Sequence, residues 1–380
     1  MTTIVDSNLP VARPSWVHSR LESRIVHLGC GAFHRAHQAL YTHHLLESTD
    51  SDWGICEVNL MPGNDRVLIE NLKKQQLLYT VAEKGAESTE LKIIGSMKEA
   101  LHPEIDGCEG ILNAMARPQT AIVSLTVTEK GYCADAASGQ LDLNNPLIKH
   151  DLENPTAPKS AIGYIVEALR LRREKGLKAF TVMSCDNVRE NGHVAKVAVL
   201  GLAQARDPQL AAWIEENVTF PCTMVDRIVP AATPETLQEI ADQLGVYDPC
   251  AIACEPFRQW VIEDNFVNGR PDWDKVGAQF VADVVPFEMM KLRMLNGSHS
   301  FLAYLGYLGG YETIADTMTN PDYRKAAFAL MMQEQAPTLS MPEGTDLNAY
   351  ATLLIERFSN PSLRHRTWQI AMDGSQKLPQ

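Results

Sequence analysis

Short apolar runs alternate with longer amphipathic runs over the first 280 residues of this 380-residue chain. Apolar runs of roughly four to eight residues are typical of buried strands, and longer runs with a period of about 3.6 are typical of helices. The strand-like runs are residues 24–28, 53–60, 78–82, 91–94, 120–127 and 178–184, and the helix-like runs are residues 34–47, 108–116 and 161–175. Strands that alternate with helices indicate a parallel sheet covered by helices, so we predict an α/β fold with a Rossmann-type domain.

The pattern changes after residue 280. Helical periodicity continues at residues 286–308, 323–334 and 347–358, and no run in this part predicts a strand. We therefore predict a dinucleotide-binding domain at residues 1–280 and a mainly α-helical domain at residues 281–380. Within the first domain, residues 144–159 contain three prolines and are predicted to be a surface loop.

Composition narrows the class of partner. The formal net charge is −13 and no dense Lys/Arg tract occurs, which argues against a nucleic-acid partner. No apolar run is long enough to span a membrane, and the N-terminus does not resemble an export signal. The eight cysteines are scattered, and the closest pair, Cys250 and Cys254, lacks zinc-site spacing, so we expect reduced thiols. We predict a cytoplasmic protein that acts on a small molecule and binds no nucleic acid, no membrane and no metal.

A glycine turn follows the first strand in IVHLGCGAFHRAH, residues 25–37. Gly29 can make the tight turn, and Gly31 can let the backbone approach a pyrophosphate at the start of the next helix. The third glycine of the usual pattern is replaced by His34, so this motif alone leaves a dinucleotide site and a structural turn both open. His34 and His37 are three residues apart, but no acidic ligand joins them in the sequence, so we do not expect a metal there.

An acidic residue that binds the adenosine ribose is expected beyond the second strand. Asp65 lies in the loop MPGNDR that follows residues 53–60. An aspartate there favours NAD over NADP because it repels a 2′-phosphate. Arg66 could accept that phosphate, and a solvated loop aspartate is the alternative.

A second motif, EMMKLRMLNGSHSF at residues 288–301, places polar residues on one side of a predicted helix. At about 100° per residue, Lys291, Asn296 and His299 lie within less than half of the circumference. Gly297 costs a helix roughly 1 kcal/mol relative to alanine, which indicates close packing there, for instance against a ligand. An amphipathic helix with a polar side has the same pattern, so the spacing leaves both interpretations open.

The catalytic interpretation of this helix is hydride transfer without a metal. Lys291 could act as acid/base on an alcohol oxygen if its pKa fell by about 3 units, which corresponds to about 4 kcal/mol. Asn296 could donate an amide N–H to the same oxygen as half of an oxyanion hole. A second amide could come from Asn187 or Asn191 in SCDNVRENG, which follows a strand end.

Taken together, these motifs resemble those of the long-chain polyol dehydrogenases, a family that includes mannitol 2-dehydrogenase, arabinitol dehydrogenase, and fructuronate and tagaturonate reductases. The matching segments are GCGAFHRAH, TEKGY, SCDN, TMVDRIVP and KLRMLNGSH, and the last has the specific spacing Lys-x4-Asn-x2-His. The resemblance spans essentially the whole chain. The similarity is greatest to the fructuronate reductase branch of the family, in the segments TMVDRIVPA, ACEPFRQWVIED and LNGSHSFLAYLG.

The resemblance implies roles for individual residues. Lys291 would be the general acid/base, Asn187 and Asn296 the oxyanion hole, and Glu129 part of a proton path to solvent. His299 and Asp226 would contact the substrate, and Asn191 drops out as the second amide. NAD would be the cofactor, with Asp65 selecting it and the turn residues Gly29, Cys30, Gly31, Ala32, Phe33, His34 and Arg35 binding it. Whether His34 and Arg35 touch the cofactor or only shape the helix start is left open.

The chain departs from the polyol-specific pattern in two ways. Mannitol-type members carry an arginine eight residues before a substrate lysine; the lysine matches Lys377, but the arginine position is Gln369. A lost polyol contact is consistent with a uronate, whose carboxylate would be bound by Lys377, Arg364 or Arg366. Family members also continue further, so we expect the helical domain to be incomplete.

The expected function is therefore reversible hydride transfer between NADH and the C5 ketone of D-fructuronate, which gives D-mannonate. Mannitol, arabinitol and tagaturonate chemistry are the alternatives within the family, and a non-catalytic NAD-binding chain is the alternative of another class. The family resemblance allows a monomer.

Overall fold

The computed structural model describes residues 4–5, 8–372 and 374, and it divides into two compact units. Unit 1 comprises Met1–Ala82, Leu91–Ala253 and Arg258–Ala282, and unit 2 comprises Glu83–Glu90, Cys254–Phe257 and Asp283–Gln380. None of the described helices is long and apolar enough to cross a membrane.

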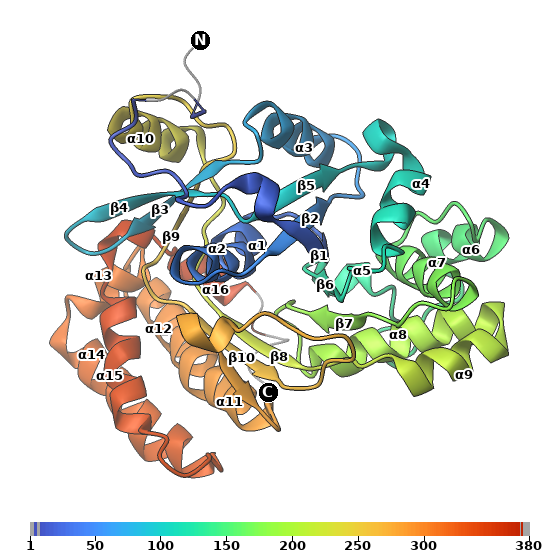
Figure 1. Ribbon diagram of the computed structural model, residues 1–380. Helices are drawn as coiled ribbons and strands as arrows, with labels where there is room; N and C mark the ends of the chain where they lie inside the picture. The colour runs from blue at the N-terminus through green and yellow to red at the C-terminus, as the bar shows by residue number, and fades with distance from the viewer. Residues whose placement is uncertain (1–3, 6–7, 373, 375–380) are drawn as a thin grey trace. The chain divides into compact units, whose positions relative to one another are not determined.

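A five-stranded parallel sheet forms the centre of unit 1 (Figure 1). Its order is β5-β2-β1-β6-β7, and every neighbouring pair is parallel. The strands are β1 (Glu22–Leu28), β2 (Trp53–Val58), β5 (Met97–Leu101), β6 (Ile122–Leu125) and β7 (Thr181–Ser184). The chain leaves β1 on one side through β2 and returns on the other through β6, which makes the carboxyl end of β1 the switch point where such sheets bind ligands. The predicted α/β Rossmann-type fold is confirmed.

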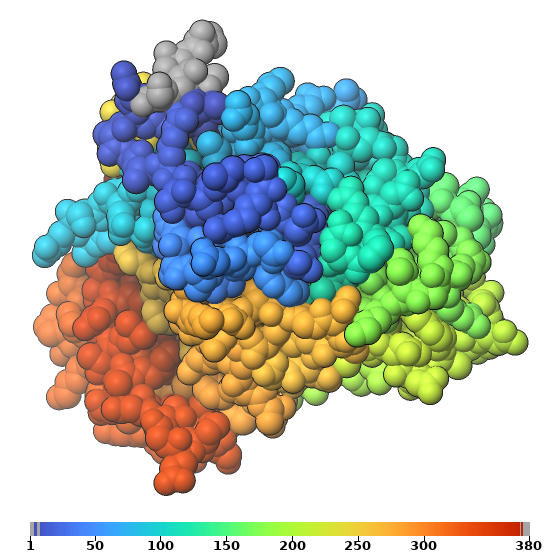
Figure 2. Space-filling view, viewed as in Figure 1, coloured from blue at the N-terminus to red at the C-terminus, as the bar shows by residue number. Residues whose placement is uncertain are grey.

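Helices α4, α7 and α8 share one apolar core with the sheet, because their inward residues pack on alternate side chains of β1, β2, β6 and β7. Figure 2 shows α7–α9, in green to yellow-green, at one end of unit 1. The helices of this part of the chain are α1 (Ala32–Ala36), α2 (Gln38–Ser48), α3 (Asn64–Lys74), α4 (Pro103–Met115), α5 (Thr128–Gly131), α7 (Ala161–Glu174), α8 (Asn191–Arg206) and α9 (Pro208–Asn217).

The remaining strands form two small sheets of three strands each. One has the order β11-β10-β8, with β8 (Thr223–Asp226), β10 (Gln259–Glu263) and β11 (Gln279–Val281). The other has the order β4-β3-β9, with β3 (Tyr79–Lys84), β4 (Thr89–Ile94) and β9 (Ile252–Cys254), and α10 (Pro234–Leu244) precedes β9. The predicted strands at residues 78–82 and 91–94 are confirmed, whereas the short strands after residue 220 were not predicted.

Two local predictions are wrong. Residues 144–159 are not all loop, because α6 (Pro146–Glu153) forms there; the Asn145 side chain accepts from the Leu147 N–H, and Pro146 occupies the first turn, where a missing N–H costs nothing. The helix predicted at residues 34–47 is interrupted at His37, whose φ of −125° and ψ of −93° separate α1 from α2.

From Asp283 onward the regular secondary structure of the described residues is helical, with no strand. A buried ion pair within this unit joins Arg357 to Glu255 at 2.8 Å. The α-helices are α11 (Val285–Met290), α12 (Gly297–Leu308), α13 (Ile314–Met318), α14 (Pro321–Ala329), α15 (Leu347–Phe358) and α16 (Thr367–Ala371), with π-helical segments at Lys291–Asn296 and Leu330–Gln335. Short 3-10 helices occur in unit 2 at Ala336–Thr338 and Pro361–Leu363, and in unit 1 at His18–Arg20 and Trp273–Val276.

Candidate functional site

The glycine turn lies where β1 ends, beside the ends of β2 and β6. Gly29 has φ +103°, and a Cβ at this position would stand 2.2 Å from the Thr126 carbonyl oxygen, so only glycine fits. The Gly29 N–H donates to the Val58 carbonyl at 2.8 Å, and the Thr126 hydroxyl donates to the Gly29 carbonyl at 2.7 Å. Three strands of the sheet therefore hold this turn in place.

Beyond Gly29 the backbone is accessible. Gly31 is exposed, and the atom nearest to a Cβ built on it is the Gly29 carbonyl oxygen at 3.9 Å. The first intrahelical hydrogen bond of α1 runs from the Arg35 N–H to the Gly31 carbonyl, so the amides of Ala32, Phe33 and His34 precede it. The turn can thus present backbone N–H groups to a diphosphate without a clash.

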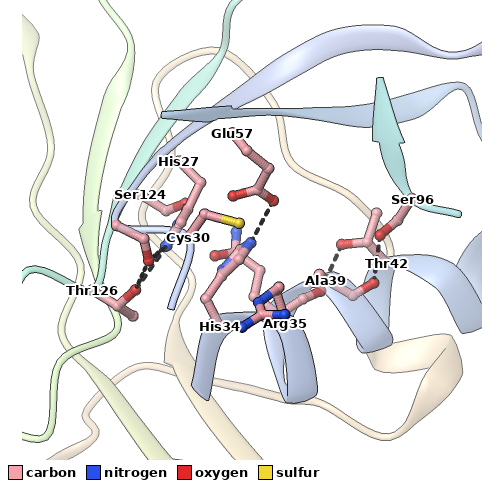
Figure 3. A network of polar contacts seen from close by, with 12 residues as sticks. His27, Cys30, His34, Arg35, Ala39, Thr42, Glu57, Ser96, Ser124 and Thr126 are labelled. Atoms are coloured by element: carbon pink, nitrogen blue, oxygen red, sulfur yellow. Dashed lines mark hydrogen bonds and ion pairs between the residues drawn. The ribbon is translucent and has the colours of Figure 1, made fainter. Parts of the chain in front are cut away.

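The side chains of His34 and Arg35 point into unit 1 (Figure 3). His34 Nε2 lies 2.7 Å from Glu57 Oε1, and its ring stacks on the ring of His27 at 3.4 Å between centroids. Arg35 Nη1 donates to the Cys250 carbonyl. These two side chains shape the start of α1. Glu57 on β2 contacts His34 but not His37, whose Nε2 lies 2.9 Å from the Gln259 carbonyl, so no carboxylate among the described residues joins the two histidines of the sequence motif.

His27, His34 and Glu57 place possible metal-ligand atoms within 4.8 Å of one another. The two imidazole planes are nearly parallel, at 13°, and stacked, so their in-plane lone pairs do not converge on one point. The nitrogens of His27 also lie 2.7 Å from the Ser124 hydroxyl and 2.8 Å from the Thr126 hydroxyl. This geometry does not fit a metal centre.

Asp65 lies in the first turn of α3, directly beyond β2. Its carboxylate accepts from the Met61 N–H at 3.4 Å, and burial raises its pKa. Arg66, which the sequence left as a possible 2′-phosphate ligand, is paired with Glu70 at 3.0 Å and with Glu104 at 3.2 Å. The phosphate-binding alternative is weakened because that guanidinium already faces two carboxylates.

A buried carboxylate that sequence reasoning missed organises the next two loops. Asp186, in the SCDN segment after β7, accepts from the Val127 N–H at 3.1 Å, the Thr128 N–H at 2.8 Å and the Tyr132 hydroxyl at 2.6 Å. Burial raises the pKa of Asp186, while these hydrogen bonds act in the opposite direction. The only sequence signal was its place at the end of a parallel strand.

Asp186 thereby joins two segments that carry predicted site residues. Glu129 follows Thr128 at the start of α5, and Asn187 follows Asp186; both side chains are exposed. Asn191 is buried, and its amide donates to the carbonyls of Asp186 and Thr223 at 3.0 and 2.9 Å. Asn191 therefore braces β8 against this loop, whereas the Asn187 side chain is exposed.

Replacing Asp186 by asparagine should destabilise the protein by about 1–3 kcal/mol, because the new NH2 group would face a backbone N–H donor in a buried site. Urea unfolding measures this effect directly. The exposed Asp242, whose carboxylate accepts from the Gln238 side chain in the same helix, gives a matched control: Asp242→Asn should change stability by less than about 0.5 kcal/mol. Equal losses in the two variants would contradict the bracing role.

Asp226, the predicted substrate contact, is the last residue of β8 and is buried. The neighbouring Arg227 is also buried, and its Nη1 donates to the Ala36 carbonyl at 2.6 Å. This bond holds the end of β8 against the end of α1, so the predicted substrate residue and the helix after the glycine turn belong to one packed region of unit 1.

The lysine motif belongs to unit 2 and is not a continuous α-helix. Lys291–Asn296 is a π-helical segment between α11 and α12. A π-helical turn contains more residues than an α-helical turn, so the angles predicted at about 100° per residue are wrong across this segment. Lys291 is buried, at 9% exposure, whereas Asn296 and His299 are half-buried. Because π-bulges frequently occur at functional sites, the distortion is itself a site signal.

The environment of the motif explains two of its residues. A Cβ on Gly297 would stand 2.6 Å from Gln335 Nε2, so the close neighbour is a protein side chain and not the ligand suggested from sequence. The ring of His299 stacks on Phe358 at 5.3 Å and meets the ring of His365 at 4.8 Å. These contacts fix one side of the histidine.

The arginines predicted to bind the substrate carboxylate lie near the end of the described chain. Arg364 and Arg366 are exposed and flank His365 in sequence, and Arg366 lies 4.0 Å from Glu312. Lys377 falls outside the described residues. The predicted site residues therefore divide between the units, with Asn187, Asp226, Glu129 and the glycine turn in unit 1 and the lysine motif with both arginines in unit 2.

Comparison with known proteins matches two family models: the mannitol dehydrogenase Rossmann domain at residues 23–275 and the mannitol dehydrogenase C-terminal domain at residues 283–380. D-mannonate oxidoreductase of Escherichia coli K12 is 99% identical over 380 residues, which cover 100% of this chain and 78% of that protein. A second relative is a mannitol 2-dehydrogenase of Pseudomonas fluorescens, solved as a ternary complex with NAD and D-mannitol. It is 42% identical with a TM-score of 0.88, and the match covers 97% of this chain and 75% of that chain. A D-sorbitol dehydrogenase solved in substrate-free form is 41% identical with a TM-score of 0.94, and the match covers 97% of this chain and 77% of that chain.

Proposed function

This chain belongs to the mannitol dehydrogenase family, and we propose that it is an NAD-dependent oxidoreductase that interconverts D-mannonate and D-fructuronate. One observation carries the choice of substrate: the 99% identity with D-mannonate oxidoreductase over the whole chain. The glutamine at position 369, where the polyol-specific pattern has an arginine, agrees with a substrate other than mannitol.

The glycine turn suits the diphosphate of NAD. It lies at the switch point of a parallel sheet, it offers backbone amides, and Gly31 leaves room for close approach. We assign Asp65 to the adenosine ribose, since it lies in the first turn of α3, the helix that follows β2. When bound, the nicotinamide supplies or accepts the hydride. The turn and Asp65 orient it by holding the other half of the dinucleotide.

The lysine motif supplies the proton. In the reductive direction, Lys291 holds the proton that the C5 oxygen receives, and in the oxidative direction it accepts the proton from the C5 hydroxyl. Burial of Lys291 favours the neutral amine that the oxidative step needs. Asn296 and Asn187 donate N–H groups to the same oxygen, and His299 donates to the substrate beside the reacting carbon.

Two further roles complete the proposal. The exposed Glu129 relays the proton between Lys291 and solvent, and Asp226 holds a substrate hydroxyl. The carboxylate of the sugar acid is bound by Arg364, Arg366 and Lys377, since a guanidinium can hold a carboxylate through two hydrogen bonds.

A panel of substrates tests this assignment. Purified protein with NADH should consume D-fructuronate fastest, with much slower or no consumption of D-tagaturonate, D-fructose and D-xylulose, as followed by NADH absorbance. Parallel assays with NADPH should be slower because Asp65 repels a 2′-phosphate. Consumption of NADH only with fructose would overturn the uronate assignment, and NADH binding without turnover of any ketose would support a non-catalytic chain.

We further propose that the protein works in the cytoplasm, and as the monomer that the family resemblance allows. None of its eight cysteines, all in the described part of the chain, forms a disulfide, and six are buried, as expected for a reducing compartment. Size-exclusion chromatography with light scattering tests the oligomeric state, and a dimer mass would contradict it.

A further inference from the structure

Beneath the glycine turn lies a buried chain of polar side chains to which the proposed reaction gives no role (Figure 3). We call it the turn relay; it consists of Ser124, His27, His34 and Glu57. His27 Nδ1 lies 2.7 Å from the Ser124 hydroxyl, the two imidazoles stack at 3.4 Å, and His34 Nε2 lies 2.7 Å from Glu57 Oε1. All four side chains are at most 1% exposed, and they come from β6, β1, α1 and β2.

The proton in the relay belongs to Glu57 near neutral pH. Burial raises the pKa of Glu57 to about 7 and lowers the pKa of His34 to about 3. Below pH 7, the neutral Glu57 carboxyl therefore donates its proton to the neutral His34 Nε2. Above pH 7 the carboxyl loses this proton, and His34 does not become charged to compensate, so a buried anion forms behind the turn.

The charged and titratable groups around Glu57 do not remove this effect. His27 on β1 faces it, and burial lowers the pKa of His27 well below its usual value, so it stays neutral. Burial raises the pKa of the Cys30 thiol in the turn, which therefore also stays neutral. On β5, the register partner of Glu57 is Ala100. Arg35 on α1 is the cation that faces Glu57, and its guanidinium also donates to the carbonyls of Gly31 and Cys250.

We propose that the His34–Glu57 pair couples its own protonation to dinucleotide binding at the glycine turn, an inference that rests on the proposed NAD site. His34 is the third residue of α1, and its backbone is part of the turn. An anionic Glu57 behind the turn lowers the positive potential that the turn amides present to a diphosphate. The neutral pair therefore favours the bound state.

The direction in which affinity changes with pH follows from thermodynamic linkage between protonation and binding. An anionic ligand raises the pKa of Glu57 in the complex above its value of about 7 in the unliganded protein. Affinity is then constant well below pH 7, falls as pH rises through the window between the two pKa values, and becomes constant again well above it. A separation of one pH unit corresponds to a tenfold weakening, so we expect roughly a tenfold loss of affinity between about pH 6 and pH 9.

Isothermal titration with ADP-ribose tests this coupling. ADP-ribose carries the diphosphate but no nicotinamide, so titration of groups around the nicotinamide does not contribute. Glu57→Gln should bind with the wild-type low-pH affinity at every pH, because the amide N–H can donate to His34 Nε2 as the protonated acid does. Glu99→Gln is the matched control: Glu99 lies on the neighbouring strand β5, is paired with Arg117, and should leave the pH dependence unchanged.

Proton uptake gives a second readout that needs no variant. At about pH 7.5, wild-type protein should take up a fraction of a proton when ADP-ribose binds, measured from titrations in two buffers of different ionisation enthalpy. A wild-type affinity that is independent of pH, or an unchanged pH dependence in Glu57→Gln, would overturn the coupling while leaving the NAD site intact. Failure of ADP-ribose to bind at any pH would instead overturn the NAD site itself.

Discussion

Replacing Lys291 by methionine is expected to lower kcat by about 10²–10⁴-fold, which is the usual effect of removing a positioned general acid. Lys291 is buried in the π-helical segment, so methionine keeps most of its volume and the fold should persist. Because the lysine acts on the substrate oxygen and not on the dinucleotide, the NADH dissociation constant should change by less than about threefold, or about 0.6 kcal/mol.

Steady-state kinetics with D-fructuronate, together with NADH fluorescence titration, separate the two effects. Lys325→Met is the matched control, since Lys325 is an exposed lysine on α14 of the same unit and should retain wild-type kcat. Near-normal turnover in Lys291→Met would remove the lysine from the mechanism. A parallel loss of NADH binding and of thermal stability would indicate a structural role instead.

Replacing Gly31 by alanine is expected to weaken NADH binding by about 5- to 150-fold, equivalent to about 1–3 kcal/mol of overpacking. In the unliganded protein the added methyl group meets nothing closer than 3.9 Å, and the backbone at φ −80° suits alanine. The substitution should therefore leave the stability of the free protein unchanged. Its cost should appear only when a diphosphate occupies the turn.

Gly29→Ala provides the contrast. Its methyl group would stand 2.2 Å from the Thr126 carbonyl at φ +103°, so the fold itself should lose about 3 kcal/mol or more. Urea unfolding without ligand and fluorescence titration with NADH distinguish the two variants. If Gly31→Ala bound NADH as tightly as wild type, the diphosphate could not lie against this turn.

The sequence predicted those parts of the fold that depend on local patterns. Residues 347–358 have a clear helical period and form α15 (Leu347–Phe358), and residues 24–28 fall within β1. The glycine turn was recognisable because Gly29 and Gly31 follow a buried strand. The short strands β8, β10 and β11 were missed because each has only two or three consecutive apolar residues, fewer than the runs of four or more that indicate a strand.

Features that depend on contacts between distant residues could not be predicted. His34 and Glu57 are 23 residues apart, and Glu57 reads in the sequence only as one acid in an apolar strand. The Asp186 carboxylate accepts hydrogen bonds from the Val127 and Thr128 N–H groups, nearly 60 residues away in sequence, and no local pattern indicates these bonds. The family motif pointed to Lys291, Asn296 and His299, but a period of 3.6 could not reveal the π-helical segment between them.

The most direct test of the whole account is transfer of deuterium from NADH labelled on the reactive face of the nicotinamide to D-fructuronate, with the product analysed by NMR and mass spectrometry. We predict D-mannonate that carries one deuterium at C5 and none elsewhere. Unlabelled product, a label at another carbon, or no D-mannonate at all would contradict hydride transfer to the C5 ketone by this protein.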